Sequence, residues 1–199
     1  IAEEAQARKA DLSVMGTRGH GALRGFALGS VALRVAHGAP VPVCLVHPDS
    51  KLPAALGRKL RVMLAMDGSP PAQRAVQALA AWRTWLGELD VQLVHVQAPL
   101  TVAEQILPPH DDLVEQWSTK GAEQATRESI ALLESLGVRK HLHLGAGDAA
   151  EEIVHLAAKT GCEMIALGTR GRGAVHHALV GSVALKVAAA SPLPVLLVK

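Results

Sequence analysis

The chain has 199 residues, of which 49% are hydrophobic, and a formal net charge of +2. This hydrophobic content is sufficient for a packed core and excludes a disordered chain, and no apolar run reaches the roughly 20 residues that cross a bilayer. The small net charge and the 2% of aromatic residues argue against a nucleic-acid partner, which requires basic patches or aromatic stacking platforms.

The first part of the chain predicts only a few elements. The pattern of residues 1–33 indicates two helices and one strand, and the strand comprises residues 12–15. A second short apolar strand is expected from Val41 to Val46. Residues 48–58 combine proline, glycine and polar side chains, which is typical of a linker. We therefore expect a separate domain to begin at residue 59.

Residues 59–199 predict a complete α/β domain. Short apolar runs alternate with helical patterns, which favours a parallel, doubly wound sheet with helices on both faces. Ser69 and Asp148 are each placed to cap the helix that follows, the latter with Glu151 positioned for a capping box. The expected strands are 60–66, 91–96, 138–144, 164–167 and 194–198. The expected helices are 70–86, 113–136 and 182–190, and a fourth helix begins after residue 148. Residues 97–110 are expected to form a loop.

An internal repeat decides the domain organisation. Residues 1–47 align without a gap with residues 153–199, at a constant spacing of 152 positions, which chance does not explain. We therefore interpret residues 1–47 as the C-terminal part of a first domain that has the same fold as residues 59–199. The recurring segments are Gly16-Thr17-Arg18-Gly19 with Gly168-Thr169-Arg170-Gly171, Gly29-Ser30-Val31-Ala32-Leu33 with Gly181-Ser182-Val183-Ala184-Leu185, and Pro40-Val41-Pro42-Val43 with Pro192-Leu193-Pro194-Val195.

Three features follow predicted strands, where parallel sheets bind their ligands. They are Asp67-Gly68-Ser69, His95-Val96, and the glycine motif that runs from Gly168 to Ser182. Glycines let backbone N–H groups approach a phosphate closely, and the helix that begins at Ser182 offers unpaired N–H groups to an anion. The alternative is that the glycines only form a turn and Ser182 only caps a helix. The lysine-bearing phosphate loop is excluded, because no Gly-Lys-Ser/Thr sequence occurs.

As a joint pattern, these residues resemble the universal stress protein family. Its nucleotide-binding members carry Gly, two residues, Gly, nine residues, then Gly-Ser/Thr, and Gly168, Gly171 and Gly181-Ser182 match that spacing. Asp67 matches the aspartate that ends the family's first strand. The resemblance covers all of the second copy and residues 1–47 of the first, in which Gly16, Gly19 and Gly29-Ser30 match.

The resemblance implies a fold, a ligand and a set of contacts. The fold is a five-stranded, doubly wound parallel sheet of the adenine nucleotide α-hydrolase type, with strand order 3-2-1-4-5, plus a partial second copy. The ligand is ATP or another adenine nucleotide, with or without Mg²⁺. Asp67 would lie near the ribose or adenine, Val96 would meet the adenine through its backbone, and the glycine motif would hold ribose and phosphates. The implied nucleotide-binding residues are Asp67, Gly68, Ser69, Val96, Gly168, Thr169, Arg170, Gly171, Gly181, Ser182 and Val183.

Other candidate sites have weaker support. His141 and His143 lie two apart on a predicted strand, but no cysteine or carboxylate completes a metal-binding spacing. Ser69 lacks both the nucleophile-elbow pattern and a recognisable His-Asp pair. Trp82 and Trp85 are three apart on one helix, which favours core packing over a cofactor contact.

We therefore expect a non-enzymatic nucleotide-binding protein of the stress response. A dimerising scaffold with a vestigial pocket and a slow ATPase of the adenine-nucleotide hydrolase type remain as alternatives. No membrane partner is expected, and Cys44 and Cys162, which lie in or beside apolar runs, favour reduced thiols in the cytoplasm. Because Ile1 is not a start methionine and no signal peptide precedes the first helix, we expect a fragment or trimmed form of a cytoplasmic protein.

Assembly can be predicted from the last strands of the two copies. An apolar strand at the edge of a sheet needs a partner, and the family resemblance implies antiparallel pairing of last strands. We therefore predict that the strand from Val41 to Val46 pairs antiparallel with the strand from Pro194 to Val198, within one chain or in a homo-oligomer. Apolar residues of the first copy, including Leu12, Val14 and Phe26, should remain uncovered.

Overall fold

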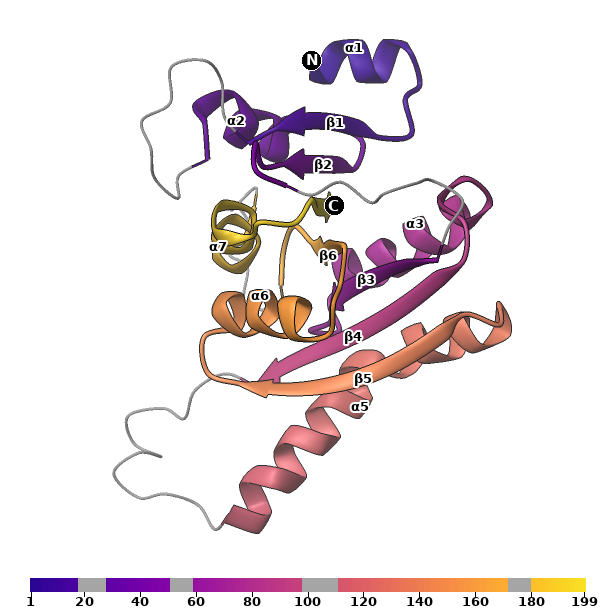
Figure 1. Ribbon diagram of the computed structural model, residues 1–199, viewed down its shortest axis with the longest axis vertical. Helices are drawn as coiled ribbons and strands as arrows, with labels where there is room; N and C mark the ends of the chain where they lie inside the picture. The colour runs from indigo at the N-terminus through magenta and orange to yellow at the C-terminus, as the bar shows by residue number, and fades with distance from the viewer. Residues whose placement is uncertain (18–27, 51–58, 98–110, 172–179) are drawn as a thin grey trace.

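The computed structural model describes residues 1–17, 28–50, 59–97, 111–171 and 180–199 (Figure 1). Gly19, His20, Phe26, Arg172, His176, His177, most of the predicted linker and the predicted loop after residue 97 lie outside the described residues. The described helices are α1 (Ala2–Ala7), α2 (Ser30–Gly38), α3 (Pro70–Leu86), α5 (Asp111–Ser135), α6 (Ala149–Lys159) and α7 (Ser182–Ala190). The described strands are β1 (Ser13–Gly16), β2 (Val43–Val46), β3 (Leu60–Ala65), β4 (Leu89–Gln97), β5 (Arg139–Ala146), β6 (Met164–Gly168) and β7 (Val195–Val198).

These strands form one seven-stranded sheet in the order β1-β2-β7-β6-β3-β4-β5. Strands β3 to β7 keep the predicted order 3-2-1-4-5 and pair in parallel. The predicted count of five strands is nevertheless wrong for the sheet as a whole, because β2 and β1 extend it beyond β7 to seven strands. The physical reason is that β7 would otherwise be an exposed apolar edge strand, and β2 covers that edge.

The junction between β2 and β7 confirms the predicted antiparallel pairing, within a single chain. Cys44 lies opposite Leu196, Val43 opposite Leu197, and Leu45 opposite Val195. Residues 44 and 196 are themselves 152 positions apart (196 − 44), so each strand meets its own repeat about a local two-fold axis between these two residues. This is the self-complementary arrangement of a symmetric dimer interface, formed here inside one polypeptide.

Local sequence signals account for the helix ends. The Ser69 hydroxyl accepts a hydrogen bond from the N–H of Ala72, Pro70 occupies the first position of α3, and Gly87 ends that helix at φ 90°. The Asp148 carboxylate accepts hydrogen bonds from the first turn of α6. Each cap satisfies N–H groups that a helix cannot bond internally.

Two helices cover each face of the main part of the sheet. Helices α6 and α7 lie on one face and α3 and α5 on the other (Figure 1). The two cores are built from alternate residues of the central strands, so that Met63 and Ile165 face α6 and α7 whereas Leu64 and Ala166 face α3. Within the described residues, no helix is long and apolar enough to cross a membrane.

The α3 side of the sheet loses its helical cover at β1. Leu196, Cys44 and Val14 lie side by side on β7, β2 and β1, and their exposed fractions rise from 2% through 8% to 65%. Ala166, the repeat counterpart of Val14, is fully buried. Val14 is therefore exposed as predicted, whereas Leu12 is half-buried against the core on the α3 side.

Candidate functional site

A cavity of about 510 Å³ lies at the carboxyl ends of β3, β4 and β6, on the face covered by α6 and α7. Parallel sheets commonly bind ligands at this end, where the strand order reverses, here between β3 and β6. The lining residues are Ala65, Met66, Asp67, Ala72, Val94, Val96, Ala149, Ile153, Leu167, Gly168, Thr169, Arg170, Gly171, Val180, Gly181, Ser182, Val183 and Ala184. Nine of the eleven predicted site residues therefore share one cavity, and only Gly68 and Ser69 do not line it.

Gly68 and Ser69 instead connect two loops beside the cavity. Gly68 adopts φ 77°, a left-handed conformation that glycine accepts without strain. The Ser69 N–H donates to Asp67 Oδ1 at 2.9 Å, and the Ser69 hydroxyl donates to the carbonyl of Arg170 at 3.0 Å. Ser69 is buried, so its contacts join the end of β3 to the loop that follows β6.

The glycines after β6 serve close packing inside the protein. A Cβ atom at Gly168 would lie 2.6 Å from the Ala72 nitrogen and 2.7 Å from the Pro71 carbonyl carbon. A Cβ atom at Gly171 would lie 2.6 Å from Asp67 Oδ2. The explanation from sequence, that these glycines admit a phosphate, is therefore incomplete: Gly168 makes room for the start of α3, and Gly171 makes room for the Asp67 carboxylate.

The start of α7 differs from the starts of the two other helices at the cavity. Its cap is Gly181, which has an extended backbone and no side chain to accept a hydrogen bond. By contrast, Ser69 caps α3 and Asp148 caps α6. Within the described part of the chain, the first N–H groups of α7, at residues 182–184 in the cavity wall, therefore receive no side-chain cap and can act as donors, and the helix dipole adds a partial positive charge there.

Backbone hydrogen bonds hold Thr169 and Gly181, two described residues between β6 and α7. The Gly181 N–H donates to the Thr169 carbonyl at 2.6 Å, and the Thr169 N–H donates to the Val198 carbonyl at 2.7 Å. The Thr169 side-chain hydroxyl is buried and has no hydrogen-bond partner among the described residues. A buried hydroxyl without a partner is costly, and this one belongs to a residue that lines the cavity.

The first copy repeats these hydrogen bonds at Thr17 and Gly29. The Gly29 N–H donates to the Thr17 carbonyl at 2.8 Å, the Thr17 N–H donates to the Val46 carbonyl at 2.9 Å, and the Thr17 hydroxyl is likewise buried without a partner among the described residues. The counterparts of Asp67 and Val96 are not part of this chain. Ser30 begins α2 as Ser182 begins α7.

Much of the cavity lining is apolar. Val94 and Val96 of β4 face Ile153 of α6, and Val180 and Val183 contribute from the segment around the start of α7. Sequence reasoning did not identify Ile153 or Ala149, although the apolar spacing of α6 marks Ile153 as facing the sheet. The cavity thus combines an apolar wall with a wall of backbone donors.

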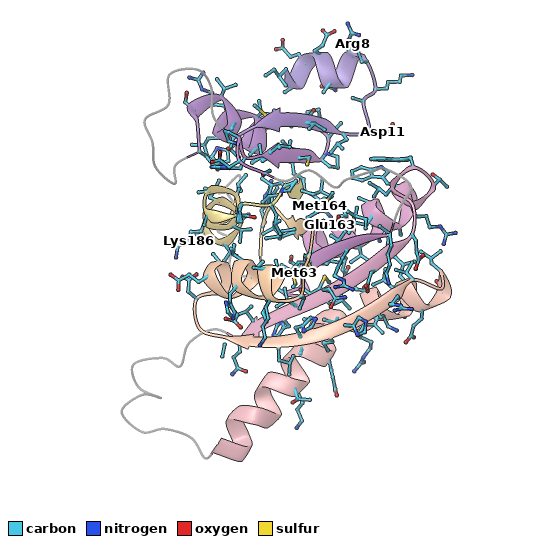
Figure 2. The ribbon with its side chains drawn as sticks, in the orientation of Figure 1. Arg8, Asp11, Met63, Glu163, Met164 and Lys186 are labelled. Atoms are coloured by element: carbon cyan, nitrogen blue, oxygen red, sulfur yellow. The ribbon has the colours of Figure 1, made fainter. Side chains whose placement is uncertain are left out.

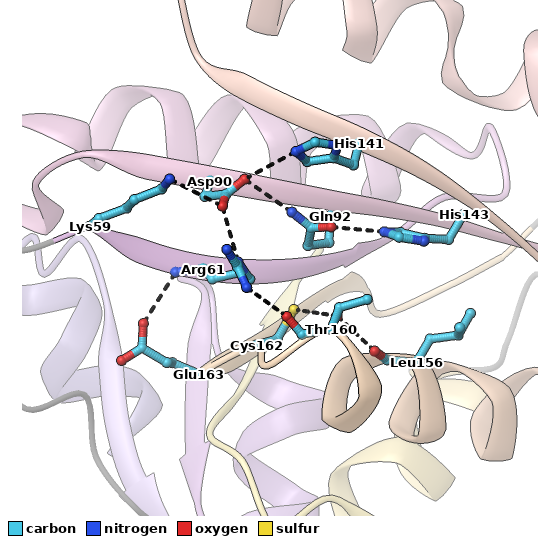
Figure 3. Close-up of polar contacts among 10 residues, drawn as sticks. All are labelled: Lys59, Arg61, Asp90, Gln92, His141, His143, Leu156, Thr160, Cys162 and Glu163. Atoms are coloured by element: carbon cyan, nitrogen blue, oxygen red, sulfur yellow. Dashed lines mark hydrogen bonds and ion pairs between the residues drawn. The ribbon is translucent and has the colours of Figure 1, made fainter.

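The remaining polar candidates have structural roles in the described part of the chain. His95 Nδ1 lies 2.8 Å from the Met66 carbonyl oxygen. His143 Nε2 lies 2.8 Å from Gln92 Oε1, in a network that centres on the buried Asp90 (Figure 3). No group of three or more potential metal-binding side chains occurs among the residues that were placed.

Asp90 is the residue of that network that sequence reasoning missed. Arg61 Nε lies 3.0 Å and Lys59 Nζ 3.4 Å from Asp90 Oδ2, and Gln92 donates to Asp90 Oδ1 at 3.0 Å (Figure 3). Burial by itself raises the pKa of Asp90, but the hydrogen bonds and charges of Arg61 and Lys59 lower it below its usual range. The network lies at the amino end of the strands, away from the cavity.

Tryptophan and cysteine side chains also contribute to packing. The rings of Trp82 and Trp85 lie 5.4 Å apart, with Trp82 packed against the core and Trp85 45% exposed. Cys44 and Cys162 are both buried and free. Burial raises the pKa of the Cys44 thiol to about 11, which keeps it protonated and unreactive.

Comparison with known proteins agrees with the α/β fold and identifies the family. A family model described as the universal stress protein family matches residues 1–47 and 60–199. A universal stress protein of Thermus aquaticus is 34% identical over 139 residues, which cover 69% of this chain and 97% of that protein. Another, from Mycolicibacterium smegmatis, is 30% identical over 192 residues, which cover 96% of this chain and 63% of that protein.

A solved structure extends the match to three dimensions. The universal stress protein from Archaeoglobus fulgidus superposes with a TM-score of 0.67 at 26% identity, over 99% of this chain and 65% of that one. This chain thus spans less than two thirds of the length of both the M. smegmatis and the A. fulgidus relatives. Given the extent of the family match and the near-complete coverage of the T. aquaticus relative, the chain belongs to the universal stress protein family.

Proposed function

We propose that this protein binds an adenine nucleotide (ATP, ADP or AMP), without significant catalysis, and acts in the stress response. The observation that carries the proposal is the uncapped start of α7 in the cavity wall. Backbone N–H groups at a helix N-terminus favour a phosphate, because they donate hydrogen bonds and lie at the positive end of the helix dipole. The family resemblance of the glycine motif points to the same ligand.

The rest of the cavity suits the nucleoside. Its volume of about 510 Å³ falls within the range of small-molecule sites, which are mostly apolar with a few placed polar groups. The wall that includes Val94, Val96 and Ile153 offers apolar contact to an adenine ring, and Val96 offers backbone groups at its edge. Asp67 is then near the ribose, and the loop from Gly168 to Gly171 is near the phosphates.

Two of the implied contacts are better assigned to the loop than to the nucleotide. Ser69 is buried and directs its hydroxyl to the Arg170 carbonyl, and Gly68 provides the turn between Asp67 and Ser69. We therefore propose that these two residues hold Asp67 and Arg170 in position.

Slow or absent hydrolysis is part of the proposal. Among the described residues that line the cavity, only Asp67 and Arg170 carry ionisable side chains. A carboxylate and an exposed guanidinium supply charge, but they do not form the acid–base pair that ordinary enzymatic turnover requires. An ATP turnover on the order of 10 per second, lost in Asp67→Asn, would favour the slow-ATPase alternative instead.

A titration tests the proposal. Calorimetry with ATP, ADP, AMP and adenosine, each with and without Mg²⁺, should give about one nucleotide per chain and tighter binding of the phosphorylated ligands. Absence of binding by all four ligands would leave the second candidate, a dimerising scaffold with a vestigial pocket. The exposed face of Val14 on β1 supports that candidate independently, because an uncovered apolar surface is suited to contact with further protein.

The organisation of the full protein is a further part of the proposal. The spacing of 152 residues and the symmetric pairing of β2 with β7 support a tandem universal stress protein, of which residues 1–47 belong to a first domain, 48–58 to a linker and 59–199 to a second domain. The open face over β1 supports association with further protein, in a homo-oligomer or with more of the first domain. Two buried, free cysteines favour a reducing, cytoplasmic setting.

A further inference from the structure

An ion pair joins α7 to the N-cap of α6, and the N-terminal ends of both helices contribute residues to the cavity. Lys186 Nζ on α7 donates to Asp148 Oδ2 at 2.8 Å, and Lys186 extends from α7 toward α6 (Figure 2). The other carboxylate oxygen, Asp148 Oδ1, accepts hydrogen bonds from the N–H groups of Ala150 at 2.9 Å and Glu151 at 3.2 Å. One carboxylate thus caps α6 and holds the side chain of α7.

Both ends of this pair adjoin residues of the cavity wall. Ala149 follows Asp148 directly and lines the cavity, and Val183 lines it one helical turn before Lys186. The side chains of Asp148 and Lys186 are 38% and 61% exposed, so the pair lies at the solvent-facing border of the site. Neither side chain lines the cavity, so the pair can affect a ligand at the start of α7 only through its charge and through the positions of the two helices.

An acidic cap in this position presents an electrostatic problem for an anionic ligand. The cap is needed because it satisfies the first N–H groups of α6, but its negative charge repels phosphate oxygens. The hydrogen bond from Lys186 lowers the pKa of Asp148, and the same contact raises the pKa of Lys186. Both groups are consequently ionised at neutral pH, and their charges cancel.

We propose that Lys186 is a positioning residue of the nucleotide site: it neutralises Asp148 and ties α7 to α6, so that the cavity favours ligands with phosphate groups over the bare nucleoside. This inference rests on the proposed function and adds a determinant of its ligand preference. Lys186 acts through Asp148 and through the position of α7. Its effect on binding affinity should therefore grow with the number of negative charges on the ligand, and the contacts to adenine should remain unchanged.

The test compares ATP, AMP and adenosine in calorimetric titrations at low salt. Lys186→Met keeps the length of the side chain and removes its charge, and it should weaken ATP binding about two- to fivefold, as expected when one partly exposed charge is left uncompensated. The affinity for AMP should fall by a smaller factor, and the affinity for adenosine should not change. Adding Asp148→Asn to this variant removes the repelling charge but retains a helix cap, and it should restore ATP affinity.

Lys140→Met is the matched control. Lys140 also pairs with a carboxylate at 2.8 Å, that of Glu134, but the pair does not border the cavity, and all three affinities should remain those of the unchanged protein. An equal loss of ATP and adenosine binding in Lys186→Met, without rescue by Asp148→Asn, would show that Lys186 only maintains the fold. Unchanged ATP affinity in Lys186→Met would overturn this inference alone, whereas failure of the unchanged protein to bind any of the ligands would overturn the proposed function as well.

Discussion

Replacement of Gly168 by alanine probes the close contact that shapes the cavity. The added Cβ would lie 2.6 Å from the Ala72 nitrogen, 2.7 Å from the Pro71 carbonyl carbon and 2.8 Å from Pro71 Cβ. Carbon atoms pack best at about 3.5–4.0 Å, so α3 would have to move away from β6 by about 1 Å. The contacting atoms are mostly backbone and cannot rotate aside, and the movement would also strain the hydrogen bond from Ser69 to the Arg170 carbonyl.

The expected cost can be stated as a change in unfolding free energy. Forcing one extra carbon into a packed region typically costs about 1–3 kcal/mol, which corresponds to a fall in Tm of about 2–12 °C for a chain of this size. Urea denaturation followed by tryptophan fluorescence measures it directly, since Trp82 and Trp85 lie on α3 itself. If α3 did not approach β6 this closely, Gly168→Ala would not lower the free energy of unfolding.

Gly38→Ala is the matched control for Gly168→Ala. Gly38 is the last residue of α2 and a Cβ there would meet nothing within 4 Å. Alanine is the better helix former by about 0.5–1 kcal/mol, so this variant should be slightly more stable than the unchanged protein. The reasoning is refuted if Gly168→Ala is as stable as the unchanged protein, or if both substitutions shift stability by the same amount and sign.

Three further predictions address the site, the polar network and the strand junction. Gly171→Val should abolish nucleotide binding, because the new side chain meets the Asp67 carboxylate, while circular dichroism should show that the protein stays folded. Full nucleotide affinity in the folded variant would contradict the assignment of Gly171 to the nucleotide site. Asp90→Asn should cost about 1–3 kcal/mol at pH 7 in urea titrations, because it leaves Arg61 with an unpaired charge. The pKa of Asp90 is lower in the folded protein than in the unfolded chain. The loss of unfolding free energy in Asp90→Asn should therefore be complete above the unfolded pKa of about 3.9, and it should shrink as the pH falls below that value. A loss that does not depend on pH would exclude an ionised Asp90. Amide hydrogens of Val43–Val46 should exchange slowly, because β2 is bonded to strands on both sides, and exchange as fast as in a disordered loop would contradict the intrachain junction.

The sequence was most informative where the signal was local or repeated. The Ser69 and Asp148 caps and the ends of α3 follow from residue types whose effect operates within one turn. The antiparallel junction of β2 with β7 followed from the repeat and from the liability of an apolar edge strand. The count of strands in the sheet was nevertheless wrong, because the five-stranded prediction described the second copy alone and the sequence left open whether the last strands pair within one chain or between chains.

Other features depend on contacts between distant segments. The packing role of Gly168 requires the position of α3, and the lining role of Ile153 requires the placement of α6 over the strand ends. The partnership of Asp90 with Arg61, and that of Lys186 with Asp148, each join residues from different elements. A single sequence shows the charges but not which of them meet, so these pairs appear only in the structure.

The central claim is that the uncapped start of α7 receives the phosphates of a bound nucleotide. The most direct measurement is the change in ¹⁵N–¹H chemical shifts as ATP is titrated into labelled protein. The largest shifts should occur at Ser182 and Val183, with smaller ones at Ala72 and Ala150, whose helices carry side-chain caps. Saturating ATP that leaves the Ser182 and Val183 amides unchanged would contradict the account.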